Sequence, residues 1–225
     1  RRYLIQEGIR PETIIKIGSC MEEVLDYYGN KIESSDICTK LDLKEKNFFV
    51  VSAHREENVD TPERLSNLMN SLNRLVGEYN MPVIFSVHPR TKARLDKLPD
   101  TFFDERVKLM KAMGFMDYIK LQKSAKCVIS DSGTIAEESS LLKFPAVTLR
   151  QAHERPEGMD EGILIMSDIN PNQVLAAVET VLKQHDNFDM KEVEDYRGGQ
   201  VSVKVSRIIY SYTDYINRTV WRKYS

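Results

Sequence analysis

Short apolar runs alternate with helical patterns along most of this chain, and no other feature of the sequence constrains the fold as strongly. Continuous apolar runs are typical of strands that are buried on both faces of a parallel sheet. Residues 48–51 and 127–129 are such runs, and the mainly apolar segments at 83–87, 107–110, 146–149 and 163–166 are also predicted strands. Helical patterns lie between or after them, at residues 62–78, 91–98, 115–123, 134–142 and 172–184. This order predicts a doubly wound, parallel α/β sheet.

The two ends of the chain carry other patterns. Residues 1–8 resemble the last turns of a helix that Gly8 closes. The remaining segments are expected to form a short strand at 14–17, a helix at 21–28 stopped by Gly29-Asn30, a linker at 31–47 with a short helix near 39–43, and a long helix at 201–222. This last helix is more aromatic than a solvated helix needs to be, so we expect it to pack on another surface.

The composition is that of a globular protein, with 41% hydrophobic and 29% charged residues. A net charge of −2 without a basic block indicates no nucleic-acid partner and no anionic membrane surface. Three cysteines without CxxC spacing indicate a reduced, cytoplasmic protein with no zinc site. The chain has no apolar run of about 18 residues and no signal-peptide pattern. It begins without Met, in what looks like the middle of a helix, so we expect a piece of a longer protein.

The apolar run at 127–129 leads directly into Ser130-Asp131-Ser132-Gly133-Thr134 and then into a helical pattern. A strand, a tight turn and a helix start leave backbone N–H groups without partners, and these groups and the helix dipole can bind an anion. Ser132 and Thr134 add hydroxyl donors, and Gly133 lets a ligand approach the backbone closely. A diphosphate fits this description. The alternative is that Asp131 and Ser132 only cap the helix.

Groups for a nucleoside lie close to this turn in the sequence. Glu138 follows one helical turn later, where its carboxylate can accept hydrogen bonds from ribose hydroxyls. Tyr118 and Phe115 precede the turn, and either ring can stack on a planar base. Core packing is the alternative for both rings and is favoured for Phe115.

Three further polar clusters follow predicted strands. They are Ser-Ala-His-Arg-Glu-Glu-Asn at 52–58, His-Pro-Arg-Thr at 88–91, and Arg-Gln-Ala-His-Glu-Arg-Pro-Glu-Gly at 150–158. In open α/β sheets, ligands bind outside the carboxyl ends of the strands. His and Arg side chains there can hold or protonate a phosphate leaving group. Each cluster alone could be a solvated loop, but together they predict a site for a phosphorylated, hydroxyl-rich ligand.

These clusters resemble the motifs of a known family. SAHREEN (52–58), HPR (88–90), SDSGTIAEE (130–138) and RQAHERPEGMDEG (150–162) are similar to motifs of the non-hydrolysing UDP-N-acetylglucosamine 2-epimerases. The forms VHPRT and AHERPEGMDEG look most like a branch that converts UDP-2-acetamido-2,6-dideoxy-L-talose to UDP-N-acetyl-L-fucosamine for surface polysaccharides such as capsules. The similarity runs from about residue 1 to residue 220.

The resemblance implies a Rossmann-like fold within a two-domain enzyme of the GT-B type. Residues 45–200 would form the second, nucleotide-sugar-binding domain. Residues 1–44 would be the end of the first domain and the connection, and residues 201–225 a terminal helix that packs back toward the first domain. The expected partners are the UDP-sugar, the N-terminal domain of the same protein and a second copy in a homodimer. No cofactor and no metal are expected.

The implied reaction inverts C2 of the sugar by elimination and re-addition of UDP through a glycal. His54 would be the catalytic residue, near the diphosphate, because leaving-group stabilisation carries much of such a reaction. The substrate-binding residues would be Arg55, Asn58, Tyr118 against the uracil, Ser132, Gly133 and Thr134 on the diphosphate, Glu138 on the ribose, and Arg155 on a phosphate or the sugar. The acid/base carboxylates would belong to the first domain, so this chain alone is expected to be inactive.

Two positions depart from the resembled pattern, and other functions stay open. Ile163 stands where the family usually has Thr, and Asp168 where it often has Gly. The alternatives are a 2-epimerase of UDP-GlcNAc and UDP-ManNAc, the donor-binding domain of a GT-B glycosyltransferase, and a non-enzymatic nucleotide-binding module.

Overall fold

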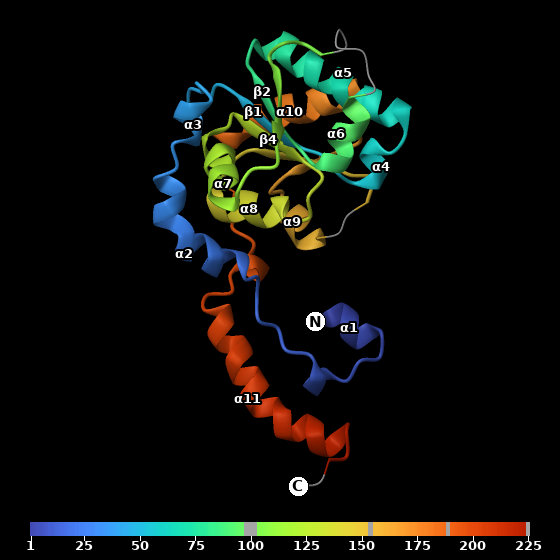
Figure 1. Ribbon diagram of the computed structural model, residues 1–225. Helices are drawn as coiled ribbons and strands as arrows, with labels where there is room; N and C mark the ends of the chain where they lie inside the picture. Colours follow the sequence, from blue (N-terminus) through green and yellow to red (C-terminus); the bar gives the residue numbers. More distant parts are fainter. Residues whose placement is uncertain (97–102, 153–154, 188–189, 224–225) are drawn as a thin grey trace. The chain divides into compact units, whose positions relative to one another are not determined.

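The computed structural model describes residues 1–96, 103–152, 155–187 and 190–223 (Figure 1). The chain divides into two compact units. The larger unit runs from Tyr28 to Val193, and the smaller one combines residues 1–27 with the segment from Glu194 onward. The larger unit contains the sheet predicted from the sequence, although it begins well before residue 45.

A six-stranded parallel sheet forms the centre of the larger unit, with the order β3-β2-β1-β4-β5-β6. The strands are β1 Phe49–Ser52, β2 Val83–Val87, β3 Val107–Lys111, β4 Cys127–Ser130, β5 Ala146–Leu149 and β6 Ile165–Ser167. This is the strand order of the Rossmann fold. The predicted doubly wound α/β fold is therefore confirmed.

Helices connect consecutive strands, as a parallel sheet requires. They are α4 Glu56–Val59, α5 Pro62–Tyr79, α6 Pro89–Leu95, α7 Phe115–Ser124, α8 Ile135–Leu142 and α9 Pro156–Asp160, and α10 Pro171–His185 follows the last strand. The limits of α5 follow from its sequence. Thr61 caps its start by accepting a hydrogen bond from the Arg64 backbone N–H, and Asn80 ends it in the left-handed conformation.

Each face of the sheet is covered by a different set of helices. Phe49 and Val51 of β1 belong to a buried cluster with side chains of α5 and α10, and these two helices also contact each other. Side chains of successive strand residues point to opposite faces. Val50, which is fully buried, therefore faces the other side, where α7 and α8 lie (Figure 1). Both faces are apolar because both are covered.

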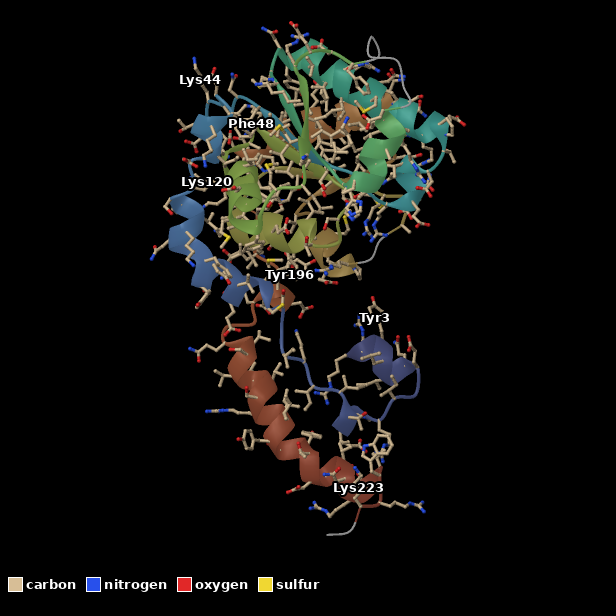
Figure 2. The ribbon with its side chains drawn as sticks, viewed as in Figure 1. Tyr3, Lys44, Phe48, Lys120, Tyr196 and Lys223 are labelled. Carbon is tan, nitrogen blue, oxygen red and sulfur yellow. The ribbon has the colours of Figure 1, made fainter. Side chains whose placement is uncertain are left out.

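The segment before the sheet departs from its prediction. Helix α2 runs from Met21 to Glu33 and does not stop at Gly29-Asn30, and α3 spans Ile37–Lys40. Continuation of α2 buries Ile32. It also places the Glu33 carboxylate against Lys123 and Lys120 of α7, and Nζ of Lys120, which is labelled in Figure 2, donates to it at 2.9 Å. Tertiary contacts thus override the local stop signal.

The smaller unit contains α1 Arg2–Gln6, the 3-10 helices η1 Pro11–Thr13 and η3 Glu194–Tyr196, the start of α2, and α11 Val201–Thr219. The long terminal helix is confirmed. The strand predicted at 14–17 is wrong, since these residues continue from η1 without sheet pairing. Within the unit, the Glu22 carboxylate accepts hydrogen bonds from the backbone N–H groups of Gly198 at 2.9 Å and Gly199 at 2.8 Å. None of the described helices has the length and hydrophobicity that a membrane crossing requires.

Candidate functional site

The candidate site lies where the chain changes direction in the sheet. Strands β1 and β4 are neighbours, yet the chain continues from β1 to β2 on one side and from β4 to β5 on the other. The loops that follow these two strands diverge, and a crevice between such loops is where open α/β sheets bind ligands. The backbone N–H of Asp131, just after β4, donates to the carbonyl of Ser52, the last residue of β1, at 3.1 Å. The loops with His54 and with Ser132–Thr134 therefore meet.

Asp131 joins the two loops. Its side chain is fully buried, and its Oδ2 atom accepts from the backbone N–H groups of His54 at 2.9 Å and Arg55 at 2.8 Å, and from Asn58 Nδ2 at 3.1 Å. Its carbonyl oxygen accepts from Arg55 Nε at 2.9 Å and from Arg150 Nε at 3.2 Å. The reading of Asp131 as a helix cap is wrong, because the first turn of α8 receives no bond from it; the N-cap residue is Thr134.

One ring nitrogen of His54 lies against Asp131, while much of the ring is accessible. Its Nδ1 atom lies 3.2 Å from Asp131 Oδ1, while 47% of its side chain is exposed. The imidazole of His88, which follows β2, has its ring centre 6.4 Å away. The clusters after β1, β2 and β4 thus converge as the sequence predicted. The Arg90 side chain of the second cluster lies outside the described residues.

Arg55 and Asn58 hold the loop that carries His54. Asn58 is 1% exposed, and its Nδ2 atom donates to Leu149 O at 3.0 Å as well as to Asp131. Its Oδ1 atom accepts from Arg64 Nη2 at 3.2 Å. Both polar atoms of this amide are therefore engaged within the protein. A contact of either residue with a ligand stays a prediction.

The turn after β4 gathers hydroxyl groups at the start of α8. Ser132 Oγ and Thr134 Oγ1 lie 2.9 Å apart, and Ser132 Oγ also accepts from the Thr134 backbone N–H at 3.3 Å. Ser132, Gly133 and Arg155 line one small cavity of about 30 Å³ together with Arg150. Arg155 forms an ion pair with Glu137 of α8. The structure thus brings the predicted diphosphate turn and Arg155 together.

Glu138 belongs to a buried polar network under this turn. It is 6% exposed, and its Oε2 atom accepts from Gln122 Nε2 at 2.7 Å. Burial raises the pKa of Glu138, although hydrogen bonds from Gln122 and Thr134 oppose the shift. The Tyr118 hydroxyl interacts with Ser52 and Gln122, and burial together with the Glu138 charge raises the pKa of Tyr118. Tyr118 and Glu138 are therefore close in space, as a shared nucleoside site requires.

Some supporting roles at the site were not predicted. Asp131, Gln122, Arg150 and Arg64 are buried or half-buried polar groups on which the named residues depend. Arg64 lies on α5 and Gln122 on α7, within helical patterns that a single sequence assigns to structure. His153 and Glu154 of the third cluster lie outside the described residues. Ile163 is buried, and Asp168 accepts hydrogen bonds from Arg64 at 2.7 Å and from Gln151 at 3.3 Å.

Comparisons with known proteins show which family the chain resembles. Residues 1–210 match the family profile described as UDP-N-acetylglucosamine 2-epimerase. A structure titled UDP-N-acetylglucosamine 2-epimerase from Rickettsia bellii is 48% identical, with a TM-score of 0.89, over 99% of this chain and 60% of that one. Methanocaldococcus jannaschii UDP-GlcNAc 2-epimerase, solved in complex with UDP-GlcNAc and UDP, is 29% identical, with a TM-score of 0.81, over 93% of this chain and 58% of that one.

A relative that is named for another substrate is also similar. The UDP-2,3-diacetamido-2,3-dideoxy-D-glucuronate 2-epimerase of Pseudomonas aeruginosa is 24% identical over 201 residues, which are 87% of this chain and 52% of that protein. The chain therefore spans little more than half the length of the relatives that it matches.

Proposed function

The chain belongs to the UDP-N-acetylglucosamine 2-epimerase family, and we propose that it supplies the UDP-binding half of an enzyme that inverts C2 of a UDP-2-acetamido sugar. One observation carries the proposal. At the switch point of the sheet, His54 lies against the buried Asp131 and beside the hydroxyl-lined turn of Ser132 and Thr134. This is an arrangement of donors that suits a diphosphate.

The proposed reaction has two steps. In the first, the C2–H and C1–O bonds break, a C1–C2 double bond forms, and UDP leaves. In the second, a proton is added to C2 from the other face and UDP returns to C1. His54 donates a hydrogen bond to the departing diphosphate, because charge that develops on a leaving group is stabilised most by prepositioned donors. Acid/base carboxylates on a preceding domain complete the proposed site.

The remaining assignments follow the family motifs that the sequence resembles. Ser132, Gly133 and Thr134 bind the diphosphate, and Arg155 binds a phosphate or the sugar. The groups expected to bind the nucleoside and to support His54 are Tyr118 against the uracil, Glu138 on the ribose, and Arg55 with Asn58 in the loop after β1. Tyr118 and Glu138 both interact with Gln122, and this closeness supports their assignment to the same nucleoside.

The identity of the sugar is a more specific proposal. We propose UDP-2-acetamido-2,6-dideoxy-L-talose, converted to UDP-N-acetyl-L-fucosamine, on the basis of the motif forms at 87–91 and 152–162. Relatives are named for UDP-GlcNAc and for a UDP-diacetamido-glucuronate, so similarity within this family does not fix the sugar. The second candidate is therefore UDP-GlcNAc, the sugar in the name of the Rickettsia bellii relative. A first-domain partner, a homodimer and a cytoplasmic location complete the proposal.

Calorimetric titration of the chain with UDP tests the nucleotide site. We expect binding in the micromolar to millimolar range that is weakened by His54→Ala and lost when Ser132→Ala and Glu138→Ala are combined. The control combines Ser211→Ala and Glu78→Ala, which remove the same side chains from exposed helix positions. Loss of binding in the control as well, or retention in the site variant, would contradict the assignment.

Turnover tests the reaction and the sugar. The chain joined to the family's first domain is incubated with each UDP-sugar in D₂O, and C2 inversion with deuterium at C2 is followed by NMR. Faster inversion of the L-talose sugar than of UDP-GlcNAc supports the finer proposal, and the reverse order supports the second candidate. Transfer of sugar to an added acceptor without inversion would point to a glycosyltransferase.

A further inference from the structure

The two oxygens of the Asp131 carboxylate have different surroundings. Oδ2 accepts hydrogen bonds from the backbone N–H groups of His54 and Arg55 and from Asn58 Nδ2, at 2.8 to 3.1 Å. The two backbone groups can only donate. The atom at the Oδ2 position must therefore be an acceptor, and the orientation of the carboxylate is fixed by the protein.

Oδ1 is left facing His54. Among the described residues, no group donates a hydrogen bond of good geometry to this buried oxygen. The nearest ring nitrogen, His54 Nδ1, lies 3.2 Å from it. A buried carboxylate oxygen without a donor costs free energy. Arg55 Nε and Arg150 Nε donate to the Asp131 carbonyl oxygen instead. The Nδ1–H of His54 is thus the donor that this oxygen is placed to receive.

We propose that Asp131 is a positioning residue that holds the proton of His54 on Nδ1 and so leaves Nε2 for the ligand. The inference rests on the proposed function, in which His54 serves the diphosphate. An imidazole held in this way presents Nε2 in one direction, and the carboxylate stabilises the positive charge when Nε2 is protonated as well. The second titratable ring near the site is His88, whose ring centre lies 6.4 Å from that of His54.

Asp131→Asn tests the inference because the loop dictates how the new amide must sit. Its oxygen takes the Oδ2 position, where three donors require an acceptor, and its NH₂ group then faces His54 Nδ1. Nδ1 must become the acceptor, so the proton moves to Nε2. A variant of this kind changes the tautomer while it keeps the shape of the site.

The measurement is the ¹⁵N NMR spectrum of the histidine side chains in the 225-residue chain at alkaline pH, where imidazoles are neutral. The chain has four histidines, and the His54 signals are identified by their loss in His54→Gln. We expect the Nδ1–H tautomer in the wild type and the Nε2–H tautomer in Asp131→Asn. The control is Asp104→Asn, which removes a carboxylate paired with Arg106 ahead of β3 and should keep the Nδ1–H tautomer.

Two results would overturn the inference. One is an Nε2–H tautomer in the wild type, which decides the matter even if Asp131→Asn does not fold. The other is an unchanged tautomer in a folded Asp131→Asn chain. The spectra are recorded without UDP, so this outcome is independent of the proposed function. UDP is then added to the wild type; failure to bind would count against the proposed function and would leave the tautomer result standing.

Discussion

Arg64 donates a hydrogen bond from Nη2 to Asp168 Oδ1 at 2.7 Å, although 104 positions separate the two residues in the sequence. The same nitrogen donates to Asn58 Oδ1 at 3.2 Å, and Asn58 in turn donates to Asp131. A continuous chain of hydrogen bonds therefore runs from the segment after β6 to the loop that carries His54. Asp168, one of the two departures from the family pattern, is part of the support of the site.

Asp168→Ala is expected to weaken UDP binding more than it lowers stability. The ion pair is partly exposed, with 37% of the Asp168 side chain accessible, so the loss of unfolding free energy should be at most about 1 kcal/mol. UDP affinity should fall several-fold because Asn58 and the His54 loop lose their support. Urea unfolding and calorimetry measure the two effects. Asp96→Ala breaks the comparable Lys92 pair on α6 and should leave affinity unchanged; equal losses in both variants would contradict the prediction.

Glu138→Gln is expected to stabilise the unliganded chain at neutral pH. Because burial raises the pKa of Glu138 in the folded state, the stability that its neutral form gives is present below the ordinary Glu pKa of about 4.3 and is lost as the pH rises through the folded value. At pH 7 the variant should therefore gain on the order of 1 kcal/mol, and near pH 4 it should gain little. Thermal unfolding at the two pH values measures this difference.

The same variant should bind UDP about tenfold more weakly, since a charged acceptor for the ribose hydroxyls is lost. Glu179→Gln, at an exposed position of α10, is the control and should change neither quantity. A Glu138→Gln chain that binds UDP like the wild type would contradict the ribose assignment, whatever its stability.

Two substitutions of Tyr118 distinguish stacking of its ring from hydrogen bonding of its hydroxyl. Tyr118→Phe keeps the ring but leaves Ser52 and Gln122 without the hydroxyl, so it should cost about 1 kcal/mol of stability with little change in UDP affinity. Tyr118→Ala removes the ring and should lower affinity about tenfold if the ring stacks on uracil. Calorimetry with UDP, compared with inorganic diphosphate, isolates the contribution of the base. Equal affinities of the Phe and Ala variants would assign Tyr118 to core packing.

The sheet could be predicted because its strands are mainly apolar segments. The segments at 83–87 and 146–149 match β2 and β5, since strands covered on both faces are apolar at most positions. The strand predicted at 163–166 begins two residues before the observed β6. Ile163 instead bonds through its backbone N–H to Gly158 O at 3.0 Å, so β6 begins only at Ile165.

The supporting part of the site could not be predicted in the same way. His54 and the turn at 132–134 stand directly after strands, and the rule for open α/β sheets places them together. Arg64 and Gln122 reach the site from helices, and their role depends on which face of α5 or α7 meets the loops. Asp131 looked like a helix cap because its partners, His54 and Arg55, are more than seventy positions away.

Gly18→Ala is expected to destabilise the smaller unit. Gly18 has φ of +84°, which a residue with a Cβ atom rarely adopts, and an added Cβ would lie 2.5 Å from Gly198 Cα. The neighbouring backbone would have to move away. The N–H groups of Gly198 and Gly199, which donate hydrogen bonds to the Glu22 carboxylate, would move with it. A cost of about 1 to 3 kcal/mol is therefore expected.

Gly77→Ala is the control, because Gly77 lies within α5 with no atom near its added Cβ. This variant should gain up to about 1 kcal/mol of stability. Hydrogen exchange of the Gly198 and Gly199 amides measures the effect: exchange as slow as in the wild type would show that this close contact does not hold the unit together.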